Sequence, residues 1–240
     1  GRGSAQGGRR HPSRPDSLSD NHVLSIVEDR EGVLWVGTAA GGLNALDRQS
    51  DSFRTYRADP ADPLSLSSDA VRCVFEDSQG NLWVGTETGG LNLFNRTAQT
   101  FTQFRNRPGD ANTLSSDEVR AIYEDRNGTL WIGTRAGINR LDRPHGRFTH
   151  YRYNSSDPYS ISSDSIWALY EDRGGVLWIG TGGGGLSKYA GALQKFKLYQ
   201  HRPNQAATLS DSDVLAVTMD AYGTLWVGTQ FGGLNRVDRA

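Results

Sequence analysis

The chain has 240 residues, enough for one or two domains with a sizeable buried core. Its 26 basic and 27 acidic residues leave a formal net charge of −1, which argues against a general nucleic-acid-binding surface. The single cysteine excludes a disulfide framework and a zinc site built from cysteines. No run approaches the roughly 20 apolar residues of a membrane span, and no signal peptide is recognised. Because the first residue is Gly1 rather than Met, we expect the chain to be part of a longer protein.

The N-terminal stretch, residues 1–16, is rich in glycine, arginine and proline and shows no strand pattern. It carries too few apolar side chains to offset the entropy of ordering, so we expect a flexible basic arm. Glycine is frequent throughout, with 29 residues in the whole chain, while the hydrophobic class amounts to 36%. This balance indicates many tight turns and close backbone packing.

From residue 17 onward the chain repeats itself with a period of about 48 residues. Each repeat contains the phrase LW[VI]GT, preceded by Asp-x-x-Gly and, in most copies, followed by a GGLN-like segment. The tryptophans of this phrase are Trp35, Trp83, Trp131, Trp178 and Trp226. We place the repeat units at about residues 17–64, 65–112, 113–159, 160–207 and 208–240, the last one partial.

Each unit contains the signals of four short strands, and no window of comparable length shows helical periodicity. The first strand precedes Asp-x-x-Gly, which suits a hairpin turn; the second is LW[VI]GT, and the third begins with GLN or a variant of it. The fourth carries paired aromatics, Phe53/Tyr56, Phe101/Phe104, Phe148/Tyr151 and Phe196/Tyr199, of which the fifth unit has no copy. Four strands at this period predict an all-β protein, a β-propeller of five four-stranded blades with the last blade incomplete. Five units could close as one ring or could belong to a larger ring.

Residues that recur once per unit are interpreted as structural. The third position of the first strand is always small, as expected where strands converge on a central axis: Ser25, Cys73, Ala121, Ala168 and Ala216. Cys73 is therefore assigned a packing role rather than a reactive one. The repeated tryptophans are assigned to the core. The repeated acids are interpreted as hydrogen-bond acceptors within and between blades: Glu28, Glu76, Glu124 and Glu171.

The combined unit, LWVGT followed by GGLN, F-x-x-Y and a DP-SLSSD linker, resembles the two-component regulator propeller repeat over about residues 17–240. The resemblance implies the sensor region of a bacterial hybrid histidine kinase or diguanylate cyclase. It further implies a periplasmic or otherwise extracytoplasmic location in an inner-membrane sensor, with a neighbouring sensor or kinase module as partner. The chain itself shows no linking β-sandwich and no kinase module.

Two patterns that could carry chemistry are better explained by the repeat. Residues 180–185 have the spacing of a dinucleotide-binding fingerprint, but the sister units carry a turn at the same place and no helix follows. The five histidines have no metal-ligand spacing. We therefore expect no cofactor and no metal.

Function is expected where the units differ from one another. Two variable slots lie beside otherwise uniform strands, namely the second residue of the first strand and the residues that follow the GT dipeptide. They supply the candidate ligand-binding residues Arg72, Arg120, Trp167, Arg135, Glu87, Gln230 and Phe231. Arginine suits carboxylates and sulfates and aromatic faces suit sugar rings, which predicts a site for an acidic saccharide or another anionic metabolite. The alternative is that the arginines are ordinary surface residues and that Trp167 fills the channel.

The sequence thus favours a non-enzymatic sensor segment that binds a small molecule, a saccharide or a partner at the propeller funnel. Neither nucleic-acid binding nor membrane insertion by this segment is expected. One alternative is a propeller glycosidase or lyase acting on polysaccharide, for which the non-repeated Glu87 and Glu118 are the candidate acids. The other is a protein-interaction scaffold that uses the same surface.

Overall fold

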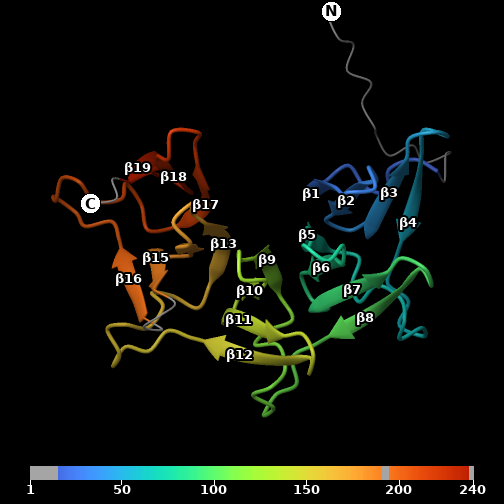
Figure 1. The fold of residues 1–240 in the computed structure, drawn as a ribbon, viewed down its shortest axis with the longest axis horizontal. Coiled ribbons are helices and arrows are strands. Elements are labelled where there is room, and N and C mark those ends of the chain that lie inside the picture. The colour runs from blue at the N-terminus through green and yellow to red at the C-terminus, as the bar shows by residue number, and fades with distance from the viewer. Residues whose placement is uncertain (1–15, 191–194, 238–240) are drawn as a thin grey trace, which may run out of the picture. The chain divides into compact units, whose positions relative to one another are not determined.

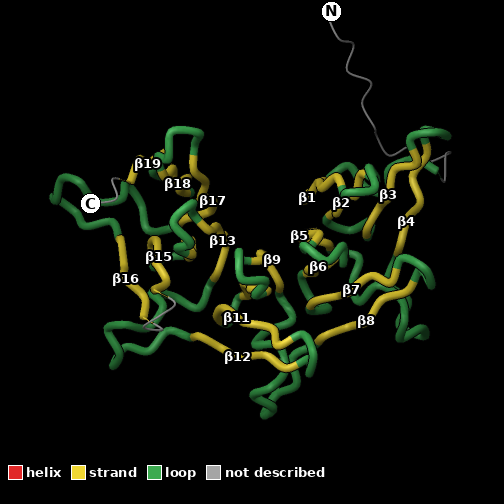
Figure 2. The backbone as a smooth tube through the Cα atoms, viewed as in Figure 1, coloured by secondary structure: helices red, strands yellow, loops and turns green. Residues whose placement is uncertain are grey.

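The fold is known from a computed structural model that describes residues 16–190 and 195–237. Within these ranges the chain forms 19 strands and no helix, as Figure 2 shows by colour. Nothing there could therefore serve as a membrane-spanning helix. The arm expected over residues 1–16 lies outside the described residues apart from Asp16.

The strands fall into five antiparallel sheets, which we call blades 1 to 5 (Figure 1). Their bounds, in chain order, are β1 (Val23–Glu28), β2 (Leu34–Thr38), β3 (Leu43–Asp47), β4 (Ser52–Tyr56), β5 (Val71–Glu76), β6 (Leu82–Thr86), β7 (Leu91–Asn95), β8 (Thr100–Phe104), β9 (Val119–Glu124), β10 (Leu130–Thr134), β11 (Gly137–Asp142), β12 (Arg147–Tyr151), β13 (Ile166–Glu171), β14 (Leu177–Thr181), β15 (Gly185–Ala190), β16 (Lys195–Tyr199), β17 (Val214–Met219), β18 (Leu225–Thr229) and β19 (Gly233–Val237).

Within each blade the strands pair in chain order, so every blade is a simple meander. Blades 1 to 4 contain four strands, and blade 5 contains β17, β18 and β19. This confirms the predicted all-β propeller blades with a last blade that is incomplete. The chain divides into two compact units, one ending at Phe104 with blades 1 and 2 and one beginning at Arg105 with blades 3 to 5. Each unit is described below by itself.

The turn between the first two strands of every blade is closed by its aspartate. In blade 1 one carboxylate oxygen of Asp29 accepts the Val33 N–H at 2.8 Å, and the other accepts the Trp35 indole N–H at 2.7 Å. The indole bond recurs in all five blades at 2.7–3.0 Å. The turn glycines have φ between 77° and 85°, the left-handed region that glycine adopts without strain. One side chain therefore fixes both the hairpin and the tryptophan.

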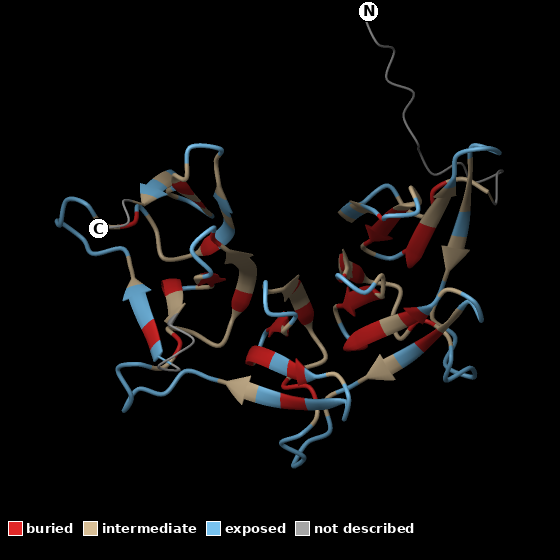
Figure 3. Cartoon of the chain, in the orientation of Figure 1, coloured by how far each residue is buried: buried red, intermediate tan, exposed pale blue. Residues whose placement is uncertain are grey.

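The core lies along the second and third strands, where Figure 3 shows most of the buried segments. Trp35, Trp83, Trp131 and Trp178 are at most 3% exposed, which confirms their assignment to the core. The tryptophan of blade 5, Trp226, is only half-buried.

Within each compact unit, neighbouring blades meet at the glycine of the LW[VI]GT phrase. A Cβ added to Gly37 would lie 2.6 Å from Cγ1 of Val71, the first residue of the next blade's inner strand. The same clash occurs at 2.6 Å between Gly133 and Ile166 and at 2.7 Å between Gly180 and Val214. A β-branched side chain of one blade thus occupies the space where a side chain of the preceding blade would stand.

The small third position of the first strand lies opposite this glycine in the pairing register, for example Cys73 opposite Gly85. A Cβ on Gly180 would already meet that of Ala168 at 3.3 Å, so both partners have to be small. Burial raises the pKa of the Cys73 thiol to about 12, which agrees with a packing role.

The repeated acids and arginines connect strands within and between blades. Glu76 of blade 2 and Glu171 of blade 4 each accept a backbone N–H from the turn of the preceding blade at 2.8 Å. Glu28 and Glu124 form ion pairs within their own blades at 2.9 and 2.6 Å. Glu76, Glu124 and Glu171 are thereby confirmed as hydrogen-bond acceptors within or between blades, and Glu28 takes part in an ion pair.

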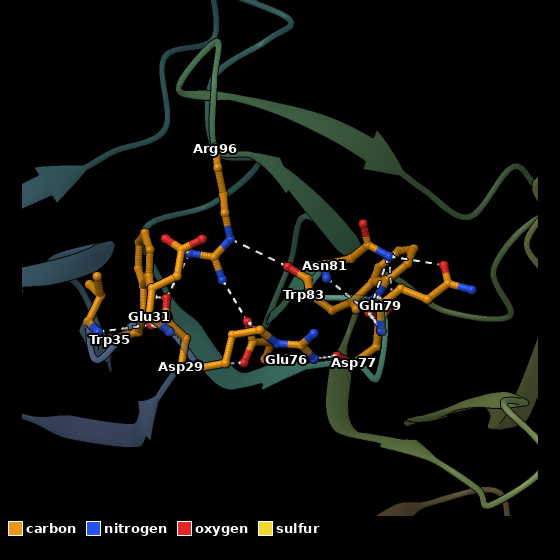
Figure 4. A network of polar contacts seen from close by, with 12 residues as sticks. Asp29, Glu31, Trp35, Glu76, Asp77, Gln79, Asn81, Trp83 and Arg96 are labelled. Atoms are coloured by element: carbon orange, nitrogen blue, oxygen red, sulfur yellow. Dashed lines mark hydrogen bonds and ion pairs between the residues drawn. The ribbon is translucent and has the colours of Figure 1, made fainter.

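Arg96 connects blades 1 and 2 through two carboxylates (Figure 4). Its guanidinium lies 2.7 Å from Asp29 of blade 1 and 3.0 Å from Glu76 of blade 2. Burial would raise the pKa of Asp29, but the hydrogen bonds from Trp35 and Arg96 outweigh it and hold the pKa below its usual value. The side chain is therefore ionised whenever the blade is folded near neutral pH.

Replacing Asp29 with asparagine should lower the free energy of unfolding at pH 7 by about 1–3 kcal/mol, because an amide N–H would face the donors of Trp35 and Arg96. The pKa of Asp29 is lower in the folded chain than in the unfolded chain, where it is near 3.8, so ionised Asp29 stabilises the fold above about pH 3.8. This stabilisation is lost as the pH falls through the folded-state pKa. The difference between wild type and Asp29→Asn should therefore narrow below about pH 4. Urea denaturation at pH 7 and pH 3 measures this difference in the free energy of unfolding. An equal difference between wild type and Asp29→Asn at both pH values would contradict the assigned ionisation.

Candidate functional site

The first strand of every blade has a β-bulge at its second residue. In blade 4, Ile166 pairs with Thr181 and Ala168 with Gly180, so Trp167 has no partner across the ladder. The same irregularity occurs in all five blades. The bulged residues are Leu24, Arg72, Arg120, Trp167 and Leu215. A bulge redirects a side chain without altering the rest of the strand, which explains why this slot varies while its neighbours do not.

A second repeated contact brings the variable slots together. In each blade the backbone N–H of the residue after GT donates to the carbonyl of the residue before the first strand, at 2.8–3.2 Å. In blade 3 this bond joins Arg135 to Glu118. We call this end of a blade, formed by the residue before the first strand, the bulged residue and the residues after GT, its rim.

The rims of blades 3 and 4 share a cluster built around Arg120. The Arg120 guanidinium carbon lies 3.9 Å from the centre of the Trp167 ring, within cation–π distance. Its nitrogens reach Glu118 at 2.7 Å and the Ser165 hydroxyl at 2.7 Å. The Arg120 side chain is only 9% exposed, so the cluster is preorganised and connects the two blades.

Arg135 stands at the open side of this cluster. Its guanidinium lies 3.7 Å from Glu118, whose second oxygen it approaches, yet its side chain remains 72% exposed. A screened contact of this length is weak. Arg135 therefore offers a cation to solvent beside a rigid aromatic–arginine pair.

The remaining candidate residues lie elsewhere. Arg72 and Glu87 form a 2.9 Å ion pair at the rim of blade 2, in the other compact unit. At the rim of blade 5, Phe231 is 81% exposed and Gln230 is also exposed. Their backbone N–H groups are held by Asp211 and by the Asp213 carbonyl.

The structure thus brings Arg120, Arg135 and Trp167 of the predicted set into one cluster, completed by Glu118 and Ser165. The sequence analysis named Glu118 only as a candidate acid and did not name Ser165. Both residues occupy the position directly before the first strand, which differs in every unit and could have indicated them from the sequence. The residues at this position are His22, Ala70, Glu118, Ser165 and Asp213.

The motifs set aside in the sequence are structural here as well. Residues 180–185 run from β14 through a turn into β15, and Gly183 and Gly185 have φ of 74° and 82°. His145 contacts Asp142, and His150 contacts the Thr113 carbonyl. In the described part of the chain, no group of three or more histidine, cysteine or acidic side chains could hold a metal ion.

A double-mutant cycle tests the Arg120–Trp167 contact. Arg120→Met and Trp167→Leu should be non-additive in free energy of unfolding, with a coupling of about 0.5–2 kcal/mol from the cation–π contact. The exposed Arg147, changed to Met, supplies the control and should be additive with Trp167→Leu. Additive effects in the Arg120 cycle, measured by chemical denaturation, would show that the contact contributes nothing.

Solved structures with this fold include three bacterial proteins. One is the extracellular domain of the protein described as the hybrid two-component system BT3049 of B. thetaiotaomicron. It is 32% identical to this chain with a TM-score of 0.78, and the alignment covers 92% of this chain and 29% of the BT3049 domain. Another is PorZ, a surface component of the type-IX secretion system of Porphyromonas gingivalis. It is 21% identical with a TM-score of 0.70, and the alignment covers 94% of this chain and 34% of PorZ. The chain therefore spans about a third or less of the length of these proteins.

Virginiamycin B lyase of Staphylococcus aureus is also similar, at 14% identity and a TM-score of 0.63, over 90% of this chain and 69% of its own. At such identities PorZ and the lyase show the fold alone. A search of curated proteins found no match.

The family comparison follows the repeat from blade to blade. The model described as "Two component regulator propeller" matches residues 17–40, 65–88, 113–136, 160–183 and 208–231. Each match runs from the linker before a first strand, through the Asp-x-x-Gly turn and LW[VI]GT, to the residues after GT. With half of its residues matched in five ordered copies, the chain belongs to the two-component regulator propeller family.

Proposed function

We propose that the chain is a non-catalytic, ligand-sensing segment of the extracytoplasmic region of a bacterial two-component signalling protein. Support comes from the family and from the 32% identity to the extracellular domain of BT3049. The location outside the cytoplasm rests on that same similarity.

The observation that carries the binding proposal is the cluster at the rims of blades 3 and 4. This cluster brings together the half-exposed face of Trp167, the largely buried side chain of Arg120 and the exposed side chain of Arg135. Preorganisation lowers the entropy cost of binding, because Arg120 is already held by Glu118, Ser165 and Trp167.

The ligand class follows from the charges. Arg135 is free to pair with a carboxylate or sulfate, and Trp167 provides a ring against which a sugar can pack. The proposed ligand is therefore an acidic saccharide. Within the same unit, the exposed Gln230 and Phe231 are proposed as further ligand contacts at the rim of blade 5. The Arg72–Glu87 pair of the other unit is proposed as a ligand contact of its own, at the rim of blade 2.

The contacts of the two non-repeated acids, Glu87 and Glu118, favour binding over catalysis. Glu118 is held by Arg120 and approached by Arg135, and Glu87 is held by Arg72, so each acts as the counter-ion of an arginine. To signal, the ligand has to bind one arrangement of the protein more tightly than another. We propose that a neighbouring module of the parent protein reads this difference.

A thermal-shift and calorimetric comparison tests the proposal on the full 240-residue chain. Oligosaccharides of hexuronic acid and sulfated oligosaccharides should bind and raise the melting temperature, and neutral oligosaccharides of equal length should bind more weakly. Arg135→Ala should weaken binding by roughly 10-fold, the effect of losing one exposed charge-assisted contact. Raising the salt concentration should weaken it further.

Arg147→Ala is the matched control, because Arg147 is also an exposed arginine of blade 3 but lies in β12, away from the rim. It should leave affinity unchanged. Equal binding of acidic and neutral sugars, or equal loss from Arg135→Ala and Arg147→Ala, would overturn the proposed site. Cleavage of the sugar during the assay would instead favour a lyase or glycosidase.

A further inference from the structure

The residue opposite the core tryptophan differs from blade to blade. In blade 1 the register pairs Trp35 with Ala45. Directly paired residues project from the same face of a sheet, so in blade 4 the Lys188 ammonium lies 5.5 Å from the centre of the Trp178 ring. Blade 1 instead has a small residue beside its tryptophan. The residues that correspond to Ala45 in blades 2 to 5 all have long side chains, namely Leu93, Arg140, Lys188 and Arg236.

A cavity of about 500 Å³ opens beside Ala45, between blades 1 and 2 of the first compact unit. Its apolar wall includes Trp35 and Tyr56 of blade 1 and Phe94 of blade 2. The Phe94 ring stands edge-on to the other two rings, with its centre 5.2 Å from that of Trp35 and 5.0 Å from that of Tyr56. These contacts fix the rings, so the wall is formed before any ligand arrives. A cavity of this size with an aromatic wall suits a small molecule that has an apolar group.

Gln99 of blade 2 holds the polar edge of this wall in place. Its side-chain oxygen accepts hydrogen bonds from the Tyr56 hydroxyl and, at 3.2 Å, from the Arg54 guanidinium. Its amide nitrogen donates to the Arg96 carbonyl at 2.6 Å. The backbone of Gln99 has a φ of 59°, which a residue other than glycine seldom adopts, and blade 3 has Gly146 at the same place in its turn. Arg54 and Tyr56 are therefore positioned by a residue in an unfavourable backbone conformation.

The edge of the cavity offers the charge of Arg54 to a ligand. Arg54 is exposed and donates to Gln99, a neutral partner, so its guanidinium can still pair with a carboxylate. Arg48 and Arg96 also line the cavity, but carboxylates of the protein already hold them. Arg48 lies 2.9 Å from Glu28, and Arg96 lies 2.7 Å from Asp29. A carboxylate group of a ligand would therefore be drawn to Arg54.

Two carboxylates line the same cavity. Glu31 is 64% exposed, and its contact with Arg96 at 3.7 Å (Figure 4) is weak because solvent screens it. The Asp47 carboxylate accepts the Gln49 N–H at 2.8 Å, and this bond holds the pKa of Asp47 below its usual value, so that it is ionised near neutral pH. These charges disfavour a simple anion. They complement a ligand that carries an ammonium group as well as a carboxylate.

We propose that this cavity binds a free α-amino acid with an apolar side chain. The side chain of the ligand occupies the space beside Ala45, against the ring of Tyr56, and buries its apolar surface there. The carboxylate of the ligand pairs with Arg54, and its ammonium group pairs with the carboxylates of Glu31 and Asp47. The site belongs to the first compact unit and is independent of the ligand proposed for the rims of blades 3 and 4.

A series of related ligands tests the proposal on the full 240-residue chain. In isothermal titration calorimetry, phenylalanine and leucine should bind with one-to-one stoichiometry. N-acetylphenylalanine lacks the ammonium charge and phenylalanine amide lacks the carboxylate, so each should bind at least roughly 10-fold more weakly than phenylalanine. Alanine should also bind roughly 10-fold more weakly, because its methyl group buries little apolar surface.

Two protein variants locate the site. Ala45→Arg introduces the residue that blade 3 has at this position, Arg140, and should abolish phenylalanine binding by filling the cavity. Arg54→Gln should weaken phenylalanine binding roughly 10-fold but leave the affinity for phenylalanine amide unchanged, since that ligand has no carboxylate. Lys197→Gln is the matched control, because Lys197 is the exposed cation at the same position of the fourth strand in blade 4. It should leave every affinity unchanged.

Three results would each overturn the proposal. They are the absence of saturable binding of phenylalanine and leucine, equal affinity for phenylalanine and its two blocked derivatives, and unchanged phenylalanine binding by Ala45→Arg. The ligand series uses the wild-type chain and so decides the case even if a variant fails to fold. Arg135→Ala, at the rim of blade 3, should bind phenylalanine as the wild type does, which separates this site from the one proposed at the rims.

Discussion

The contact between the glycine of one blade and the β-branched residue that opens the next is the constraint from which the rest follows. It allows no Cβ at Gly37, Gly133 or Gly180, because Val71, Ile166 and Val214 occupy that space. It also requires a small residue opposite the glycine, as Ala168 shows. Around this contact, each blade keeps its own hairpin and tryptophan in place through the turn aspartate. The strands can then repeat with little variation, because each solves the same packing problem.

The rims of the blades can vary because this constraint does not reach them. The bulge releases one side chain per inner strand, and the rim hydrogen bond places it beside two further variable residues. In blades 3 and 4 these slots contain Arg120, Trp167 and Arg135, which form a cluster with charge and an aromatic face. A uniform framework thus carries a surface that differs from blade to blade, and this difference supports the proposed binding at the rims.

The period of the tryptophans and the turn signals were sufficient to predict the blades, because their spacing reports local structure that every copy repeats. The candidate residues were predicted in the same way, as departures from the repeat. What spacing could not predict is which side chains meet. Arg120 turns to Glu118, two residues earlier, and to Ser165 of the next blade, and Arg72 turns to Glu87. These pairings depend on the bulge and on the close approach of adjacent blades. The pattern of apolar residues in the strands predicts neither of them.

A matched pair of glycine substitutions tests the central contact most directly. Gly180→Ala brings a Cβ within 2.7 Å of Val214, whereas the nearest atom to a Cβ at Gly228 is that of Ala216 at 3.5 Å. Chemical denaturation should show a loss of about 1–3 kcal/mol for Gly180→Ala, since a packed core does not yield to an added methyl group. Gly228→Ala should be neutral or stabilising by up to about 1 kcal/mol, because alanine loses less entropy than glycine in a strand. Equal effects at both positions would show that the contact between blades does not govern the fold.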